Sequence, residues 1–157
     1  MKVICGVLGS RVCAIEHIGS TSVPGLGGKN IIDIMVGVSG PVEANQCLLL
    51  LERIGYSEVT PQENNADWYY CLGKRQQRVG YHLHLVRFDS EHWKKQLIFR
   101  DFLRENHEVS QEYCRLKKEL AAKFGADRLG YTEAKTGFIE STLACARQQA
   151  TAQNRKH

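Results

Sequence analysis

The stretch between residues 12 and 38 constrains the fold more than any other part of the chain. Residues 12–18 and 30–38 are apolar and rich in β-branched side chains, which predicts two strands. The residues between these strands, 19–29, are rich in Gly, Ser, Thr and Pro, so they predict a loop. The second strand has the composition of a buried strand, yet it carries Asp33. The sequence therefore predicts that one strand leads into a Gly-Ser loop and that the next strand presents an acid.

The rest of the chain predicts further strands and then helices. Pro41 and Gly55 are typical of the two ends of a helix, and apolar residues recur at helical spacing between them. Strands are predicted at residues 56–60, 68–72 and 81–88, a basic turn region at 73–80, helices at 91–106, 108–124 and 133–146, and a first strand or a frayed start at 1–8. Strands followed by helices indicate an α+β fold. We expect a single domain over residues 1–146 and a polar C-terminal tail at residues 147–157.

Composition supports one globular domain and excludes several classes of protein. The chain has 157 residues, of which 43% are hydrophobic and 24% are charged, so neither a disordered nor a fibrous protein is expected. Its six cysteines form no C-x-x-C pair, which argues against a zinc finger. No apolar run approaches the roughly 20 residues that span a bilayer, and residues 1–8 are too short for a signal peptide. We therefore expect a cytoplasmic protein that does not enter a membrane.

The net charge of +4 is unevenly distributed along the chain. Residues 1–90 are balanced, so the whole excess lies in residues 91–157, the half that is predicted to be helical. Such an excess suits a phosphorylated small molecule or weak contact with nucleic acid, although nucleic acid is not the expected partner. A solvated helix surface is the alternative explanation for most of these charges.

The Gly-Ser loop is a candidate phosphate-binding site. Backbone N–H groups and hydroxyls at a turn can surround phosphate oxygens, and a lysine can add a positive charge. The candidate residues for this role are Gly19, Ser20, Thr21, Ser22 and Lys29. An ordinary connection between two strands is the alternative interpretation.

A longer pattern surrounds this loop. It consists of residues 16–26 (EHIGSTSVPGL), Lys29 with residues 31–36 (IIDIMV), residues 82–84 (HLH), residues 99–104 (FRDFLR), Tyr113, residues 116–117 (LK) and residues 131–135 (YTEAK). This pattern resembles the GrpB family of the nucleotidyltransferase-like superfamily, and the resemblance extends over roughly residues 15–139. It implies a nucleotidyltransferase-like mixed β-sheet with a C-terminal helical bundle packed against it. Similar domains occur fused to dephospho-CoA kinase, which implies a protein partner as an alternative role.

The acid set that the resemblance implies is incomplete in this chain. Active members of the superfamily use an Asp-x-Asp/Glu pair on one face of a strand to hold Mg²⁺. Here the first position is Asp33, whereas the second is Met35, and a thioether is a poor ligand for Mg²⁺. The later strand that would supply a third acid carries His82 and His84 instead. The resemblance therefore implies a degenerate nucleotidyltransferase active site.

Histidines give this site a second possible chemistry. Asp33, His82, His84 and His17 could form a set of nitrogen and oxygen ligands that suits Mn²⁺ or Zn²⁺ better than Mg²⁺. Alternatively, Asp33 and His84 could be catalytic, with the imidazole acting as a general base. A strand with one polar, hydrogen-bonded face is the structural alternative to both.

The predicted helices carry basic and aromatic residues four positions apart. Arg100 and Arg104, Tyr113 and Lys117, and Tyr131 and Lys135 each lie on one side of a helix. We expect Arg100, Tyr113, Lys117 and Lys135 to bind substrate phosphates and to form a cleft with the Gly-Ser loop. Surface charge and aromatic packing are the alternative for each pair taken alone.

The function predicted from these features is the binding of a phosphorylated small molecule or nucleotide. Two other functions remain open, an active nucleotidyltransferase on another substrate and a non-catalytic module that docks on a partner protein. A polar cleft lined by Asp33 and His84 would favour an enzyme or a ligand-binding domain, whereas an exposed apolar patch near Gly19 would favour docking.

Overall fold

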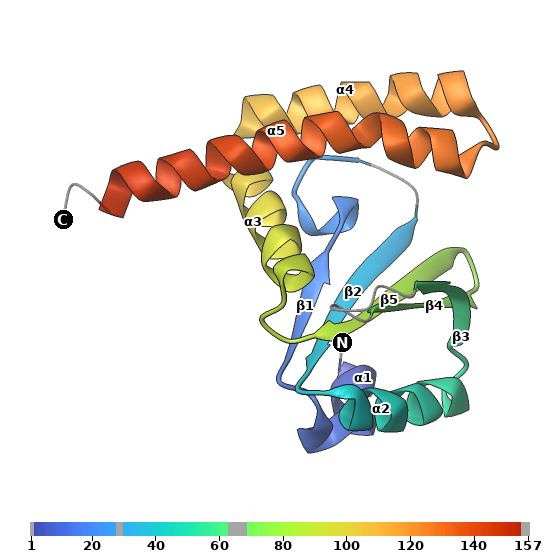
Figure 1. The fold of residues 1–157 in the computed structure, drawn as a ribbon. Helices are drawn as coiled ribbons and strands as arrows, with labels where there is room; N and C mark the ends of the chain where they lie inside the picture. The colour runs from blue at the N-terminus through green and yellow to red at the C-terminus, as the bar shows by residue number, and fades with distance from the viewer. Residues whose placement is uncertain (1, 28–29, 63–68, 155–157) are drawn as a thin grey trace. The chain divides into compact units, whose positions relative to one another are not determined.

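The computed structural model of the chain describes residues 2–27, 30–62 and 69–154 (Figure 1). Their helices and strands follow in the order α1 (Lys2–Leu8), β1 (Ala14–Ile18), β2 (Ile31–Val38), α2 (Pro41–Arg53), β3 (Ser57–Gln62), β4 (Tyr69–Gln76), β5 (Val79–Arg87), α3 (Glu91–Glu105), α4 (His107–Phe124) and α5 (Arg128–Asn154). Short 3₁₀ turns, η1 (Gly9–Arg11) and η2 (Ser20–Ser22), flank β1. The predicted α+β fold is confirmed.

The described strands form one mixed sheet of five strands in the order β1-β2-β5-β4-β3. Only the central pair, β2 and β5, is parallel, and its connection contains α2. The other three pairs are antiparallel, with β1 bordering β2, and β4 bordering both β5 and β3. The register places Asp33 of β2 beside His82 of β5, so the two segments predicted to carry the site are neighbours.

The chain divides into two compact units, and each is described here by itself. Unit 1 consists of Met1–Ser22 and Gly28–Gln96, and unit 2 consists of Val23–Gly27 and Leu97–His157. The sheet, α1 and α2 belong to unit 1, whereas α4 and α5 belong to unit 2, and the division falls within α3. The single domain predicted for residues 1–146 stays a prediction.

The core of unit 1 lies on one face of the sheet. Successive strand residues point to opposite faces, so Ile34, Val36 and Val38 share one face and are fully buried there, as are Leu83 and Leu85 of β5. This face packs against α1 and α2, which lie together beneath it in Figure 1. The opposite face of β2 and β5 carries Asp33, Met35, His82 and His84. The polar residues of these two strands thus lie on the face opposite to α1 and α2.

Unit 2 is built around the pair α4 and α5, which run side by side in opposite directions (Figure 1). The turn between them contains Gly125, whose φ of +52° lies in the left-handed region that favours glycine. A cluster of Val23, Leu26, Leu103 and Tyr113 forms the buried core near α3 and α4. The segment that follows the Gly-Ser turn is therefore part of the packing of unit 2.

Three element predictions differ from the structure. Residues 2–8 form a helix because Ile4 and Leu8, one turn apart, are both buried against the unit 1 core. The basic region 73–80 is mostly strand, since β4 continues to Gln76 and β5 begins at Val79. The last helix runs through Arg128–Asn154 and so includes most of the predicted tail. Within the described residues, no helix is both long and apolar enough to cross a membrane, and the cytoplasmic location stays a prediction.

Candidate functional site

The Gly-Ser turn is held closely against Asp33. After β1 the chain passes through Gly19, whose φ of +70° favours glycine, into the η2 turn. The Ser22 N–H and hydroxyl groups both donate to the Gly19 carbonyl, at 3.1 and 2.6 Å. A Cβ atom on Gly19 would overlap the Asp33 carboxylate and lie 2.9 Å from Asp33 Cβ. Only glycine therefore allows this turn to pack directly on the acid.

Asp33 lies between two imidazoles on the face of the sheet opposite to α1 and α2. Its Oδ1 atom is 3.4 Å from His82 Nδ1 and 3.5 Å from His84 Nε2. The side chains of Asp33 and His84 are 23% and 16% exposed, whereas that of His82 is 40% exposed, so ligands could reach the cluster from the His82 side. The structure thus brings together the Gly-Ser turn, Asp33, His82 and His84. Their roles as catalytic or metal-binding residues stay predictions.

Met35 occupies the position where the superfamily would place its second acid. It points to the same face as Asp33, because it is two residues further along β2. Its exposure is 0%, so neither water nor a hydrated ion contacts this position. The residues present do not fit a Mg²⁺ site of two carboxylates. Glu16, paired with Met35 across β1 and β2, is the acid on β1 that shares this face.

His17 is not brought together with the other predicted ligands. In the antiparallel register it pairs with Ile34, whereas Ile18 pairs with Asp33, so His17 points to the opposite face of the sheet. Its Nε2 atom is 2.9 Å from Thr21 Oγ1, which joins the end of β1 to the η2 turn. Side chains alternate between the two faces of β1, and this alternation was the signal that would have separated His17 from the other predicted metal ligands. Lys29 lies outside the described residues.

Arg100, in unit 2, has a structural partner next to it in the sequence. Its Nε atom donates to Asp101 Oδ1 at 2.7 Å and its Nη2 atom donates to Asp101 Oδ2 at 3.0 Å. Arg104 also reaches Asp101 Oδ1, at 3.2 Å. Such a bidentate ion pair offsets the charge that was predicted to face a phosphate. Asp101 is thus a residue that the sequence analysis missed, although it stands between the two arginines.

The other predicted ligands of unit 2 form an aromatic cluster with lysines above it. Tyr113 stacks on Phe138, with ring centroids 5.1 Å apart, and Lys117 Nζ lies 5.2 Å from the Tyr113 ring. Burial, and then the neighbouring Tyr131 hydroxyl, raise the pKa of Tyr113 to about 12, so its hydroxyl is a neutral hydrogen-bonding group at physiological pH. Lys135 Nζ lies 4.2 Å from the centre of the Tyr131 ring. Each lysine is thereby held over a tyrosine.

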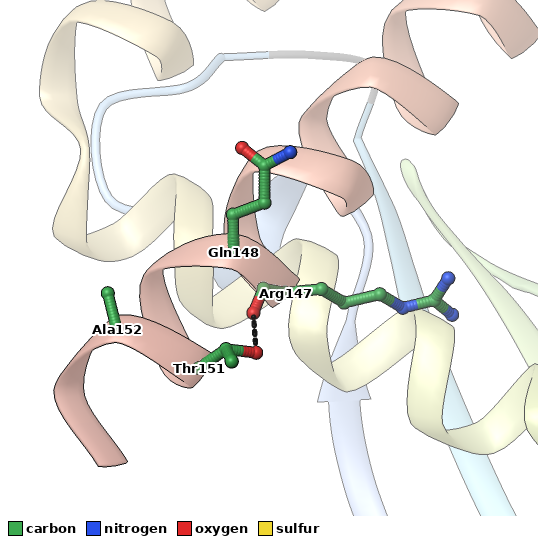
Figure 2. A pocket seen from close by; sticks show the side chains of 4 residues that line it. All are labelled: Arg147, Gln148, Thr151 and Ala152. Carbon is green, nitrogen blue, oxygen red and sulfur yellow. Dashed lines mark hydrogen bonds between the residues drawn. The ribbon is translucent and has the colours of Figure 1, made fainter. Parts of the chain in front are cut away.

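The predicted cleft joins residues of unit 1 to residues of unit 2, and it stays a prediction. One surface hollow lies elsewhere, on the last turns of α5, where Figure 2 shows Arg147, Gln148, Thr151 and Ala152. Its lining side chains come from a single helix, and Thr151 is tied to that helix by a hydrogen bond to the Arg147 carbonyl. The hollow contains none of the predicted site residues.

Metal binding by Asp33, His82 and His84 needs a change in side-chain positions. Ligand atoms of a tetrahedral zinc site are about 3.3–3.4 Å apart, close to the two separations from Asp33 Oδ1 to the imidazole nitrogens. Nevertheless, in the part of the chain that the structure describes, no group of three or more His, Cys, Asp or Glu side chains could hold a metal ion as arranged. The imidazoles would have to turn toward a common point.

We expect Mn²⁺ or Zn²⁺ to bind more tightly than Mg²⁺, because this cluster offers nitrogen ligands and one carboxylate. In calorimetric titrations, the change His84→Ala should weaken Mn²⁺ or Zn²⁺ at least about tenfold. His107→Ala, which removes an imidazole from unit 2, is the matched control and should leave the affinity unchanged. Tight Mg²⁺ binding that survives His84→Ala would contradict this expectation.

Comparison with known proteins shows which family has a sequence similar to this chain. The chain matches the family model described as GrpB protein over residues 1–144. It is 32% identical to a UPF0157 protein of Halalkalibacterium halodurans, over 90% of this chain and 71% of that protein. It is 34% identical to the glutamate-rich protein GrpB of Alkalihalophilus pseudofirmus, over 87% of this chain and 80% of that protein.

Solved structures with the same fold fall into two groups. The crystal structure of the conserved protein GrpB from Enterococcus faecalis matches with a TM-score of 0.80 and 31% identity, covering 95% of this chain and 88% of that one. The Cid1 poly(U) polymerase with Mg and 3′-dATP bound matches with a TM-score of 0.56 and 14% identity, covering 85% of this chain and 44% of that one. The second similarity shows that this chain shares its fold with part of a poly(U) polymerase.

Proposed function

Because this chain belongs to the GrpB protein family, and because its Gly-Ser turn and acid lie together, we propose that it binds a phosphorylated small molecule or a nucleotide. The turn residues Ser20 and Thr21 supply donors for phosphate oxygens, while Asp33, His82 and His84 contact the ligand or an ion that accompanies it. The incomplete acid set leaves the protein without the nucleotidyl transfer activity of its superfamily.

The packing of Gly19 against the Asp33 carboxylate is the observation that carries this proposal. It places hydrogen-bond donors of the turn next to a partly exposed acid that is flanked by two imidazoles. A loop that merely connected two strands would not need a glycine in the left-handed region beneath an acid. Close approach of backbone to a polar group is a common reason for such a glycine.

Nucleotides are the favoured ligands within this class. The fold is shared with a poly(U) polymerase whose structure contains 3′-dATP and Mg. On unit 2, Lys117 and Lys135 lie over tyrosine rings and are candidate partners for phosphate charge. Arg100 is a weaker candidate, since Asp101 already binds two nitrogen atoms of its guanidinium.

We expect nucleoside triphosphates to bind without being used in nucleotidyl transfer. Transfer needs acidic ligands that hold metal against the triphosphate and the attacking oxygen, and Met35 supplies no negative charge. With Mg²⁺, Mn²⁺ or Zn²⁺, the purified protein should therefore transfer no labelled nucleotidyl group at the enzyme-like rate of about 1 per second. The assay is run against nucleotides, alcohols, amines and protein, with equilibrium binding measured in parallel.

The variants Asp33→Asn and Glu16→Gln make this assay decisive. Glu16 pairs with Met35 and is a diagonal neighbour of Asp33 across β1 and β2, so it is the acid nearest in register to the missing one. Turnover that both variants abolish would show that Glu16 completes the acid pair and that the protein is an active transferase. Absence of both turnover and binding would leave the docking module as the remaining function.

A further inference from the structure

We infer that His17 is a positioning residue for the proposed phosphate site, because its imidazole holds the Thr21 hydroxyl group and leaves the hydroxyl proton for the ligand. This inference rests on the proposed function and gives His17 a role other than the metal binding predicted from the sequence. His17, the Gly-Ser turn and Asp33 all belong to unit 1, so the contacts that carry the inference lie within one compact unit.

The Gly-Ser turn contacts side chains that point to opposite faces of the sheet. On one face, the Asp33 carboxylate lies directly against Gly19. His17 points to the other face, because its partner in the register is Ile34. Its Nε2 atom nevertheless lies 2.9 Å from Thr21 Oγ1, four residues further along the chain. The turn is therefore held at its first residue by Asp33 and in its middle by His17.

Thr21 carries a hydroxyl group that a ligand can reach from solvent. The neighbouring Ser22 is 6% exposed, and its hydroxyl donates to the Gly19 carbonyl at 2.6 Å, so that proton is used within the turn. Thr21, by contrast, is exposed, and the His17 ring that contacts it is half-buried. Of these two hydroxyl groups, the one that His17 holds is the one placed to meet a phosphate.

The direction of the hydrogen bond between His17 and Thr21 decides what Thr21 offers to a ligand. A ring nitrogen that carries a proton donates it, whereas a bare ring nitrogen accepts one. If Nε2 accepted, the Thr21 proton would be used by the imidazole, and Thr21 would present only lone pairs. Phosphate oxygens are acceptors, so a phosphate ligand requires the opposite direction. In that direction the Nε2–H group donates to Thr21 Oγ1, and the hydroxyl proton is fixed toward the phosphate before binding.

Two measurements on the ligand-free protein test this inference. The nitrogen-15 shifts of the His17 ring show which nitrogen carries a proton, and we expect a proton on Nε2. The Ser22 N–H group closes the turn on the Gly19 carbonyl and reports on its opening by hydrogen exchange. In His17→Leu this amide should exchange about fivefold faster, since one hydrogen bond that holds the turn is lost. A bare Nε2 atom, or unchanged exchange at Ser22, would overturn the inference.

His107 in unit 2 provides the matched control. Its Nε2 atom lies 2.9 Å from Gln111 Nε2, again four residues further along the chain and again at an exposed position. His107→Leu should therefore leave exchange at Ser22 unchanged, whereas His17→Gln, which keeps a side-chain N–H donor, should restore the slow exchange. Equal effects of His17→Leu and His107→Leu would overturn the inference. Because no ligand is present, these outcomes are independent of whether phosphate binds.

Affinities for pyrophosphate and ATP then show whether His17 acts through Thr21. His17→Leu should weaken both ligands about fivefold, and His17→Gln should restore the affinity. In Thr21→Val, which lacks the hydroxyl, the further change His17→Leu should have no additional effect in a double-mutant cycle.

Two results of these binding measurements would overturn the inference. Tighter binding by His17→Leu would mean that the imidazole had used the Thr21 proton, and additive losses in the cycle would mean that His17 contacts the ligand itself. Failure of the unmodified protein to bind pyrophosphate and ATP would contradict the proposed function, while the exchange result would still decide whether His17 holds the turn.

Discussion

Met35→Asp should destabilise the protein by about 3 kcal/mol or more, because a carboxylate would be buried without a partner. Met35 is completely buried and lies two residues from Asp33 on the same face of β2, so the new charge would also face a like charge. Urea denaturation would measure the loss in the free energy of unfolding. Restoring the acid pattern of the superfamily would thus damage the fold without producing a transferase.

Met35→Leu is the matched control for this result. A hydrophobic side chain of similar volume should cost less than about 1.5 kcal/mol. If Met35→Asp were instead as stable as Met35→Leu and began to transfer nucleotides, this position would be accessible to metal. An acid at position 35 would then be enough for transfer, with the histidines in place of the third acid.

Gly19→Ala should weaken both the fold and ligand binding. The new methyl group would adopt an unfavourable φ of +70° and overlap the Asp33 carboxylate. We expect a loss of about 1–2 kcal/mol from the backbone and about 1–3 kcal/mol more from forced movement of Asp33. Because Asp33 would be displaced from the turn, nucleotide affinity should fall at least about tenfold, which corresponds to about 1.4 kcal/mol.

Gly25→Ala separates these two causes. Gly25 has a similar φ of +76°, but no atom lies within 4 Å of a Cβ atom placed there. Its substitution should therefore cost only the backbone strain of about 1–2 kcal/mol and should leave nucleotide affinity unchanged. Equal losses of stability and affinity in the two variants would show that contact between the turn and Asp33 has no special role.

Local sequence patterns predicted the elements that position the site. The Gly-Ser loop follows β1, and Asp33 lies on β2. These consecutive strands pair directly, so the proximity of the loop and the acid follows from a short connection. His82 and His84 could be placed on one face from their spacing alone, and the structure puts that face beside Asp33. Helix α2 was also predictable, because Pro41 marks its start and its apolar spacing is regular.

Features that depend on tertiary contacts escaped the sequence analysis. The burial of Met35 is decided by what covers the strand and not by the pattern within it. Lys117 was predicted to face a phosphate, whereas its hydrogen bond to Gly27 joins residues that no local pattern relates. The bidentate contact of Arg100 with Asp101 depends on side-chain rotamers, which spacing along a helix does not specify.

The central claim is that a phosphorylated ligand binds where the Gly-Ser turn meets Asp33. Amide resonances of the isotope-labelled protein, followed by NMR while ATP, ADP and pyrophosphate are added in turn, test it most directly. We predict saturable shifts at residues 19–22, Asp33 and His84, and their loss in Gly19→Ala but not in Gly25→Ala. Absence of any saturable shift at millimolar concentrations, or shifts confined to residues away from the turn and Asp33, would contradict the claim.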